Sequence, residues 1–204
     1  MDSDLFPLII TNEDISLIES TIDSYLQHPR INTVLFMAPY ISSYFINMIE
    51  RSNARLILAL INKNAPKYTV EAMKKLRMLD YRLIRENIAA SGAIKTDRGK
   101  KIPFILTPSM KKSLEINREV YIKEIQSPDG RKKNVFVHMK LLVPYYFDRN
   151  TKKLTPECVF SGSVNWTAGG IKNNDEILII LRDRNSVKKC VSILETYWNT
   201  GLLK

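Results

Sequence analysis

Apolar positions in the first third of the chain follow two different periods. Isoleucine and leucine at helical spacing predict a helix over residues 12–27, which Asn12 caps and which ends before Pro29, because the residue preceding a proline avoids the helical region. Near-continuous apolar runs at residues 31–38 and 55–61 predict two strands that are covered on both faces. This segment therefore alternates between helix and strand.

The same alternation continues along the chain. Further helices are expected from Ser42 or Ser43 to Arg51, from a cap at Thr69 to Leu79, and over residues 186–198; further strands are expected over 81–85, 135–143, 158–164 and 176–181. Alternating strands and helices are typical of a layered α/β domain. We expect residues 1–204 to form one such domain.

Residues 86–134 depart from this pattern. The stretch contains three glycines and three prolines, with basic residues throughout. We interpret it as a basic insertion or an elaborated loop region of the domain. Within it, residues 110–125 are expected to include a helix or an extended hairpin, and residues 127–130 a turn.

Positive charge is concentrated in the middle of the chain. The net charge is +10, and residues 95–153 alone hold fifteen Lys/Arg and six Asp/Glu, a net charge of +9. A localised basic block is typical of a protein that binds a polyanion, although a solvated lysine-rich surface has the same composition. The candidate contacts to nucleic-acid phosphates are Lys95, Arg98, Lys100, Lys101, Lys111, Lys112, Arg131, Lys132 and Lys133.

Composition also argues against several classes of protein. No stretch approaches the ~20 uninterrupted apolar residues of a membrane-spanning helix, and the acidic residues 1–4 are unlike the start of a secretory signal. We therefore expect a cytoplasmic protein with no membrane partner. The two cysteines and two histidines lack the spacing of metal ligands, so no metal and no cofactor is expected.

Polar residues that suit phosphodiester chemistry lie between residues 138 and 176. His138 and Lys140 are two apart in a predicted strand, so their side chains share one face. Ser163 and Asn165 are again two apart at the end of the next predicted strand, and Glu176 precedes the last one. If the strands are neighbours, imidazole, ammonium, hydroxyl, amide and carboxylate converge.

Each of these five groups has a role in displacement at phosphorus. Lys140, Ser163 and Asn165 can hold the non-bridging oxygens, on which negative charge develops. A neutral imidazole nitrogen of His138 can attack phosphorus, and the carboxylate of Glu176 can fix the ring tautomer. Each assignment has an alternative. A lone histidine is more often structural than catalytic, and Glu176 could be a carboxylate that only faces solvent.

The order of these residues resembles the HxK(x)nGSxN signature of the phospholipase D superfamily. The matching residues are His138 and Lys140, then Gly162, Ser163 and Asn165, then Asn174 and Glu176 at the family's trailing acidic position. The resemblance implies a layered α/β/α domain with a mixed central sheet. It also implies a metal-independent phosphodiesterase with a covalent phosphohistidine intermediate, in which a second histidine protonates the leaving oxygen.

The chain holds one copy of the motif, because His28 is followed by Pro29 and lies in no HxK. The resemblance therefore implies a homodimer in which His138 of one subunit attacks and His138 of the other acts as the acid. One position departs from the family: Tyr145 stands where an aspartate is usual, five residues after Lys140. We expect Tyr145 to pack rather than to stack on bases.

Three functions are consistent with the sequence. The first is a nuclease with DNA as the favoured substrate, which could be the cleavage component of a restriction-type system. The second is a phospholipid phosphodiesterase. The third is an inactive nucleic-acid-binding module. The basic block favours nucleic acid over lipid. The complete set of motif residues favours an enzyme, a hydrolase that acts on ester bonds, over a module without activity.

Overall fold

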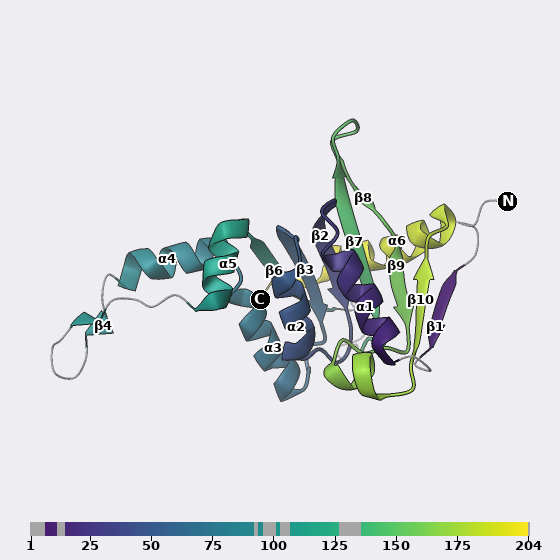
Figure 1. Cartoon of the computed structure of the whole chain (residues 1–204), viewed down its shortest axis with the longest axis horizontal. Coiled ribbons are helices and arrows are strands. Elements are labelled where there is room, and N and C mark those ends of the chain that lie inside the picture. Colours follow the sequence, from purple (N-terminus) through teal and green to yellow (C-terminus); the bar gives the residue numbers. More distant parts are fainter. Residues whose placement is uncertain are drawn as a thin grey trace.

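A mixed sheet of nine strands forms the centre of the molecule (Figure 1). The computed structural model describes residues 7–11, 15–91, 94–95, 101–102, 107–126 and 136–203. Within them the sheet consists of β1 (Leu8–Thr11), β2 (Ile31–Met37), β3 (Leu56–Ile61), β6 (Glu119–Glu124), β7 (Leu141–Asp148), β8 (Lys153–Pro156), β9 (Val159–Gly162), β10 (Ile177–Leu181) and β11 (Leu202–Leu203). The strand order is β1-β10-β9-β7-β2-β3-β6-β11, with β8 paired to β7.

Strand direction makes this sheet mixed. β2, β3 and β6 run parallel to one another, and the remaining neighbours are antiparallel. A separate two-stranded sheet joins β4 (Ile94–Lys95) to β5 (Lys101–Ile102). The mixed central sheet expected from the family resemblance is therefore confirmed.

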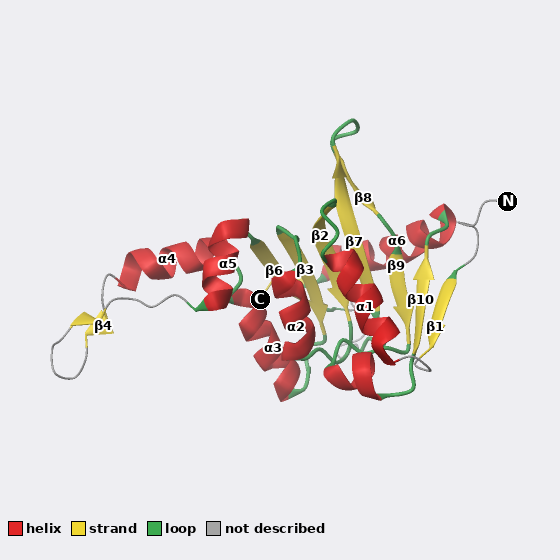
Figure 2. Cartoon of the chain, in the orientation of Figure 1, coloured by secondary structure: helices red, strands yellow, loops and turns green. Residues whose placement is uncertain are grey.

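Helices cover both faces of the sheet (Figure 2). They are α1 (Ile15–Leu26), α2 (Ser43–Arg51), α3 (Lys67–Arg77), α4 (Tyr81–Ser91), α5 (Pro108–Ile116), the short π-helix η2 (Gly169–Asn173) and α6 (Arg184–Thr200). One core cluster joins α1, α2 and α3 to the sheet, and a second joins α6 to the opposite face.

β2 shows how the sequence builds these two cores. Val34 and Phe36 belong to the cluster under α1 to α3, whereas Leu35 and Met37 belong to the cluster under α6. Successive strand residues point to opposite faces, so a strand that is buried on both faces is apolar at most positions. The near-continuous apolar run at residues 31–38 is therefore explained, and the α/β/α prediction is confirmed.

The strand expected at residues 81–85 is wrong, because this segment belongs to helix α4. The buried carboxylate of Asp80 accepts hydrogen bonds from the backbone N–H of Arg82 at 2.9 Å and of Leu83 at 3.4 Å, which caps the helix. The same carboxylate binds the N–H of Val120 at 2.9 Å. Burial would raise the pKa of Asp80, but the hydrogen bonds from Arg82 and Val120 hold it below its usual value.

The strand that extends the parallel part of the sheet comes instead from residues 86–134. After α4, which leads away from the sheet in Figure 1, this region contributes α5 and then β6, which pairs with β3. That the region is an insertion into the domain stays a prediction. The turn expected at residues 127–130 and the cap at Asn12 lie outside the described residues.

Helix α3 begins at Lys67, after Pro66, rather than at a cap formed by Thr69. The hydroxyl of Thr69 instead accepts a hydrogen bond from the backbone N–H of Ile41 at 3.1 Å. This contact ties α3 to the segment after β2. The sequence pattern therefore predicted the helix, whereas a tertiary contact determined the role of its threonine.

Candidate active site at one end of the sheet

Three neighbouring strands bring the motif residues to one end of the sheet. β7 begins at Leu141, directly after Lys140, and β9 ends at Gly162, directly before Ser163. β10 begins at Ile177, directly after Glu176. β9 runs antiparallel to both β7 and β10. The start of β7, the end of β9 and the start of β10 therefore lie at the same end of the sheet.

The strand expected at residues 135–143 begins later than predicted, at Leu141, so His138 and Lys140 precede it. The segment 136–140 is held by the buried side chain of Asn62, which follows β3. Its amide oxygen accepts from the N–H of Val137 at 2.9 Å, and its amide nitrogen donates to the carbonyl of Val137 at 3.1 Å. A side chain thus supplies the hydrogen bonds that a neighbouring strand would have given.

His138 and Lys140 are in direct contact. The Nζ of Lys140 lies 2.9 Å from Nδ1 and 3.4 Å from Nε2 of the exposed His138 ring. A charged ammonium group can only donate hydrogen bonds, so Nδ1 is the acceptor while Lys140 is protonated. Lys140 is 7% exposed, and its burial lowers its pKa against the opposing effect of the negative charge of Glu176.

Ser163 and Glu176 form a second pair. The Ser163 hydroxyl donates a hydrogen bond to the Glu176 carboxylate, and its oxygen accepts one from the N–H of Ile177 at 3.0 Å. The carboxylate was expected to orient the His138 ring. Among the described contacts it binds Ser163 and acts electrostatically on Lys140 instead.

Asn165 is positioned by close backbone packing. Its backbone lies against Gly170 of η2, where a Cβ would meet the Asn165 carbonyl oxygen at 2.5 Å, so only glycine fits. The Asn165 Oδ1 is buried and has no hydrogen-bond partner among the described residues. The next residue, Trp166, is fully buried. It stacks on Phe45 and donates a hydrogen bond to the Met37 carbonyl at 3.2 Å, and these contacts fix the chain beside Asn165.

An aromatic row, Tyr40, Tyr68 and Phe136, lies beside the candidate site. Ring centroids are separated by 6.2 Å between Phe136 and His138, 6.5 Å between Phe136 and Tyr40, and 6.3 Å between Tyr40 and Tyr68. Phe136 and Tyr68 are 53% and 47% exposed. Sequence reasoning missed this row. Its one sequence signal is Phe136, which is two residues from His138.

The basic candidates are not gathered at this site among the described residues. Lys111 and Lys112 lie on α5, beside α4 in Figure 1, and Lys95 and Lys101 pair in the small β4–β5 sheet. The other five, Arg98, Lys100, Arg131, Lys132 and Lys133, lie outside the described residues. Their contacts to nucleic acid stay predictions.

Tyr145, at the family's usual aspartate position, packs in the core under α6, and burial raises its pKa. Its expected packing role is confirmed. The gap between Lys140 and Gly162 is occupied by the β7–β8 hairpin. Packing rather than a carboxylate therefore stabilises the sheet at this position.

Comparison with known proteins agrees with the mixed sheet and its two helical layers and identifies the fold as that of a phosphodiesterase family. The chain belongs to the phospholipase D superfamily: the family model described as "Cardiolipin synthase, PLD-like domain" matches residues 46–198. No curated protein matches the sequence.

Two solved structures share the fold over nearly their whole length. NucT from Helicobacter pylori has a TM-score of 0.57 and 14% identity, covering 98% of this chain and 99% of its own. The phospholipase D family member Nuc from Salmonella typhimurium has a TM-score of 0.53 and 14% identity, with the same coverage. In the described part of the chain, no helix has the length and apolar character needed to cross a bilayer.

Proposed function

We propose that this protein is a metal-independent nuclease, with DNA as the favoured substrate, that acts through a phosphohistidine on His138 in a homodimer. The observation that carries the proposal is the contact between Lys140 and the exposed His138 ring, next to the Ser163–Glu176 pair, in a phospholipase D superfamily chain. A nucleophile, a cation and hydrogen-bond donors at one sheet edge are what phosphodiester cleavage requires.

The Lys140–His138 contact defines a resting state that the substrate must change. While Lys140 donates to Nδ1, the ring proton resides on Nε2. A phosphate oxygen is a stronger acceptor than a neutral ring nitrogen and draws the Lys140 ammonium away from the ring. The released ring can then carry its proton on one nitrogen and attack with the other.

Cleavage would then take two displacements at phosphorus, the first by His138 and the second by water. The lone pair of a His138 ring nitrogen forms a bond to phosphorus, and the bond from phosphorus to the leaving oxygen breaks. His138 of the second protomer gives that oxygen a proton. Water then attacks phosphorus and gives a proton back to that histidine, the P–N bond breaks, and His138 returns to its neutral form.

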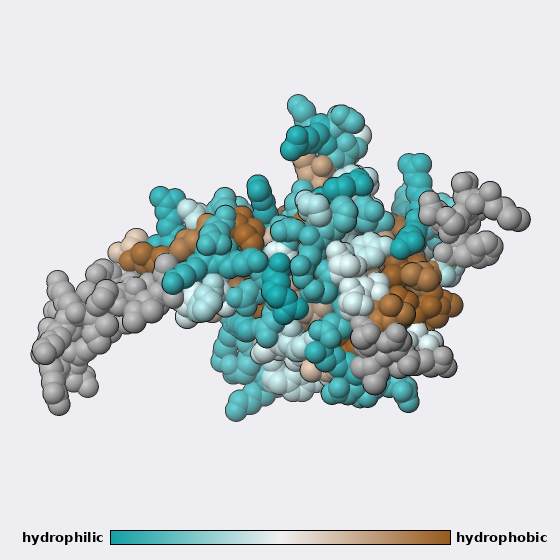
Figure 3. All heavy atoms as spheres, in the orientation of Figure 1, coloured by the Kyte–Doolittle hydropathy of each residue, from teal (hydrophilic) through white to brown (hydrophobic). Residues whose placement is uncertain are grey.

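Two observations support the participation of a second copy. The sequence holds one HxK and one GSxN, so one chain supplies one reactive histidine. Apolar surface lies over β1 and β10 (Figure 3), and Ile9 and Ile177, which are 59% and 46% exposed, share one face of this strand pair. Ile177 follows Glu176 directly, so a copy that covers this patch also approaches the candidate site.

DNA is favoured over lipid for two reasons. Residues 95–153 carry a net charge of +9, which suits a polyanion. The aromatic row next to His138 offers exposed ring faces on which bases can stack.

A phospholipid phosphodiesterase is the second candidate. The observation that favours it is the description of the matching family, which names cardiolipin synthase. The exposed rings of Tyr68 and Phe136 would in that case contact acyl chains rather than bases. The substrate therefore has to be determined by assay.

The proposal is tested by incubating the protein with plasmid DNA and with phosphatidylethanolamine vesicles, each in excess EDTA. We expect DNA cleavage that survives EDTA and falls by about 10⁴-fold in His138→Ala. His28→Ala is the matched control, because His28 is the other histidine of the chain and is exposed. Release of ethanolamine without DNA cleavage, or equal loss in both variants, would contradict the proposal.

A further inference from the structure

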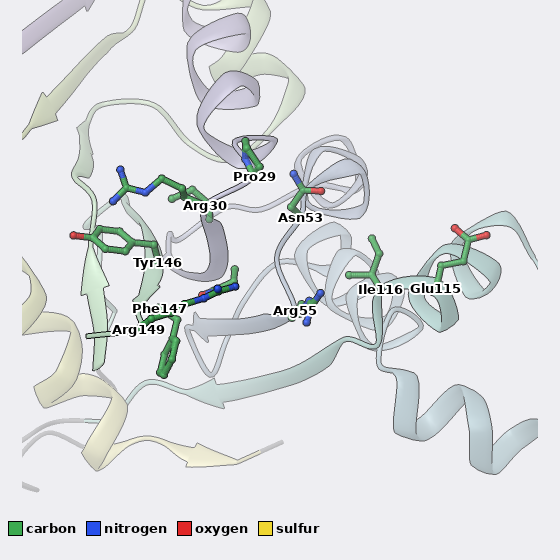
Figure 4. A pocket seen from close by; sticks show the side chains of 11 residues that line it. Pro29, Arg30, Asn53, Arg55, Glu115, Ile116, Tyr146, Phe147 and Arg149 are labelled. Carbon is green, nitrogen blue, oxygen red and sulfur yellow. The ribbon is translucent and has the colours of Figure 1, made fainter. Parts of the chain in front are cut away.

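A second candidate site lies at the opposite end of the sheet (Figure 4). A pocket of about 650 Å³ opens where β2 begins and β7 ends, and its lining includes Arg30, Arg55, Arg149, Asn53 and Tyr146. The volume lies within the usual range for ligand sites. The candidate active site is at the other end of the same two strands, where Met37 pairs with Leu141.

The charges of this pocket are uncompensated. The guanidinium groups of Arg55 and Arg149 form no hydrogen bond or ion pair within the described part of the chain. Arg30 lies over the Tyr146 ring, 4.4 Å from its centroid, and so keeps its charge unpaired. Glu115 is the one carboxylate in the lining, and it is in no described ion pair. Three unpaired guanidinium groups around one pocket suit an anion with several oxygens.

The wall that carries Arg55 is fixed before any ligand binds. The fully buried Arg118 donates to the carbonyl of Ala54 at 3.0 Å and of Ser52 at 2.5 Å. Asn53 donates to the Gln27 carbonyl at 2.6 Å. The N–H of Arg55 donates to the Asn32 carbonyl at 2.8 Å. These four contacts fix the backbone from which Arg55 projects, so binding has to order only its side chain.

The distance between the candidate active site and the arginine pocket sets the length of a ligand that would reach both. Seven residues of extended chain separate Lys140 from Phe147, which corresponds to about 23 Å. At about 3.4 Å per nucleotide along a duplex, this straight-line separation equals at least seven nucleotides of one strand, because β7 is covered on both faces and a ligand has to pass around the covering helices. Tyr146 and the 46%-exposed Phe147 add ring faces for a base or sugar at the pocket.

We infer that the Arg30–Arg55–Arg149 pocket binds phosphate groups of a nucleic-acid strand seven or more nucleotides from the bond that is cut. The inference rests on the proposed nuclease function for the identity of its ligand. The pocket contributes affinity and register and takes no part in the chemistry. It would also set a minimum substrate length for full affinity.

The test measures binding without cleavage. A fluorescein-labelled duplex of 24 base pairs is titrated, in EDTA, against the His138→Ala protein with and without Arg55→Gln/Arg149→Gln. We expect Kd to rise about tenfold and the slope of log Kd against log salt to fall by about 1.8, or 0.9 per lost contact. The control is Lys188→Gln/Lys189→Gln, which removes two exposed charges from α6 and should change Kd less than twofold.

The remaining outcomes are decisive. Equal binding by the arginine variant and the α6 control would overturn the inference, as would competition by polyglutamate as strong as by unlabelled DNA, which would indicate an acidic protein partner. An arginine effect in a chain without nuclease activity would overturn the proposed function alone. Nuclease activity with no arginine effect would overturn this inference alone.

Discussion

The two ends of the central sheet carry positive charge in opposite ways. At one end Lys140 is buried and contacts His138, and the negative charge of Glu176 raises the pKa of Lys140. At the other end Arg55 and Arg149 are exposed and have no ion pair among the described residues. Burial with a partner positions a group and changes its pKa, whereas exposure leaves its charge free for a ligand. The first arrangement suits chemistry and the second suits binding.

The largest expected effect separates these two roles. Lys140→Met removes the cation that would hold a non-bridging oxygen, so turnover of bis(4-nitrophenyl) phosphate should fall by about 10³-fold. Stability should be unchanged or higher, because the variant no longer buries a charge. Arg55→Gln should leave turnover of this small substrate unchanged. Equal losses in both variants would remove the distinction between the ends.

A smaller effect is expected from the packing that positions Asn165. A Cβ at Gly170 would meet the Asn165 carbonyl oxygen at 2.5 Å, whereas a Cβ at Gly169 meets its nearest atom at 3.7 Å. Gly170→Ala should therefore lower kcat about 10²-fold, because a misplacement of about 1 Å costs that much. Gly169→Ala is the matched control and should retain activity. Active Gly170→Ala protein would show that the Asn165 position is not critical.

The aromatic row should contribute to substrate binding rather than to chemistry. Removing Tyr68 or Phe136 deletes one stacking face, worth about 1–3 kcal/mol per base, so KM for an oligonucleotide should rise about tenfold. Turnover of an abasic oligonucleotide of the same length, which has no base to stack, should change less. Ile193→Ala serves as the control, since Ile193 is a 41%-exposed apolar residue on α6. Equal effects on both substrates would exclude a stacking role.

The smallest expected effect is a shift in pH dependence. Burial lowers the pKa of Lys140, so activity should decline as pH rises through a value below the ordinary lysine value of about 10.4. The charge of Glu176 raises this pKa, so Glu176→Gln should move the decline to still lower pH. Strand binding through arginines should not change over this range. A decline that stays in place in Glu176→Gln would contradict the electrostatic link.

The sequence predicted most of the layered core, because its strands are buried on both faces and its helices on one. The apolar runs that became β2 and β3 are short and bounded by proline or asparagine, which favours strands over buried helices. Residues 81–85 were misassigned because a short apolar segment fits either structure. The residue that decided the outcome was the capping Asp80, whose position before the segment was available in the sequence.

The candidate site was predictable only as far as its motif extends. Spacing brought His138, Lys140 and Ser163 together, but the pairing of Glu176 with Ser163 depends on side-chain geometry that spacing does not determine. The aromatic row and the arginine pocket were not predictable. Their members come from separate elements, such as Tyr40 after β2 and Arg149 in the β7–β8 hairpin, and meet only in the folded chain.

The central claim is that His138 becomes covalently attached to phosphorus, and trapping that adduct tests it most directly. The protein is mixed with excess labelled oligonucleotide, denatured within milliseconds at alkaline pH, digested and examined by mass spectrometry. We expect a burst of one cleaved fragment together with a nucleotide phosphoramidate on the peptide that contains His138. An adduct on a different residue, or a burst of cleavage with His138 unmodified, would contradict it.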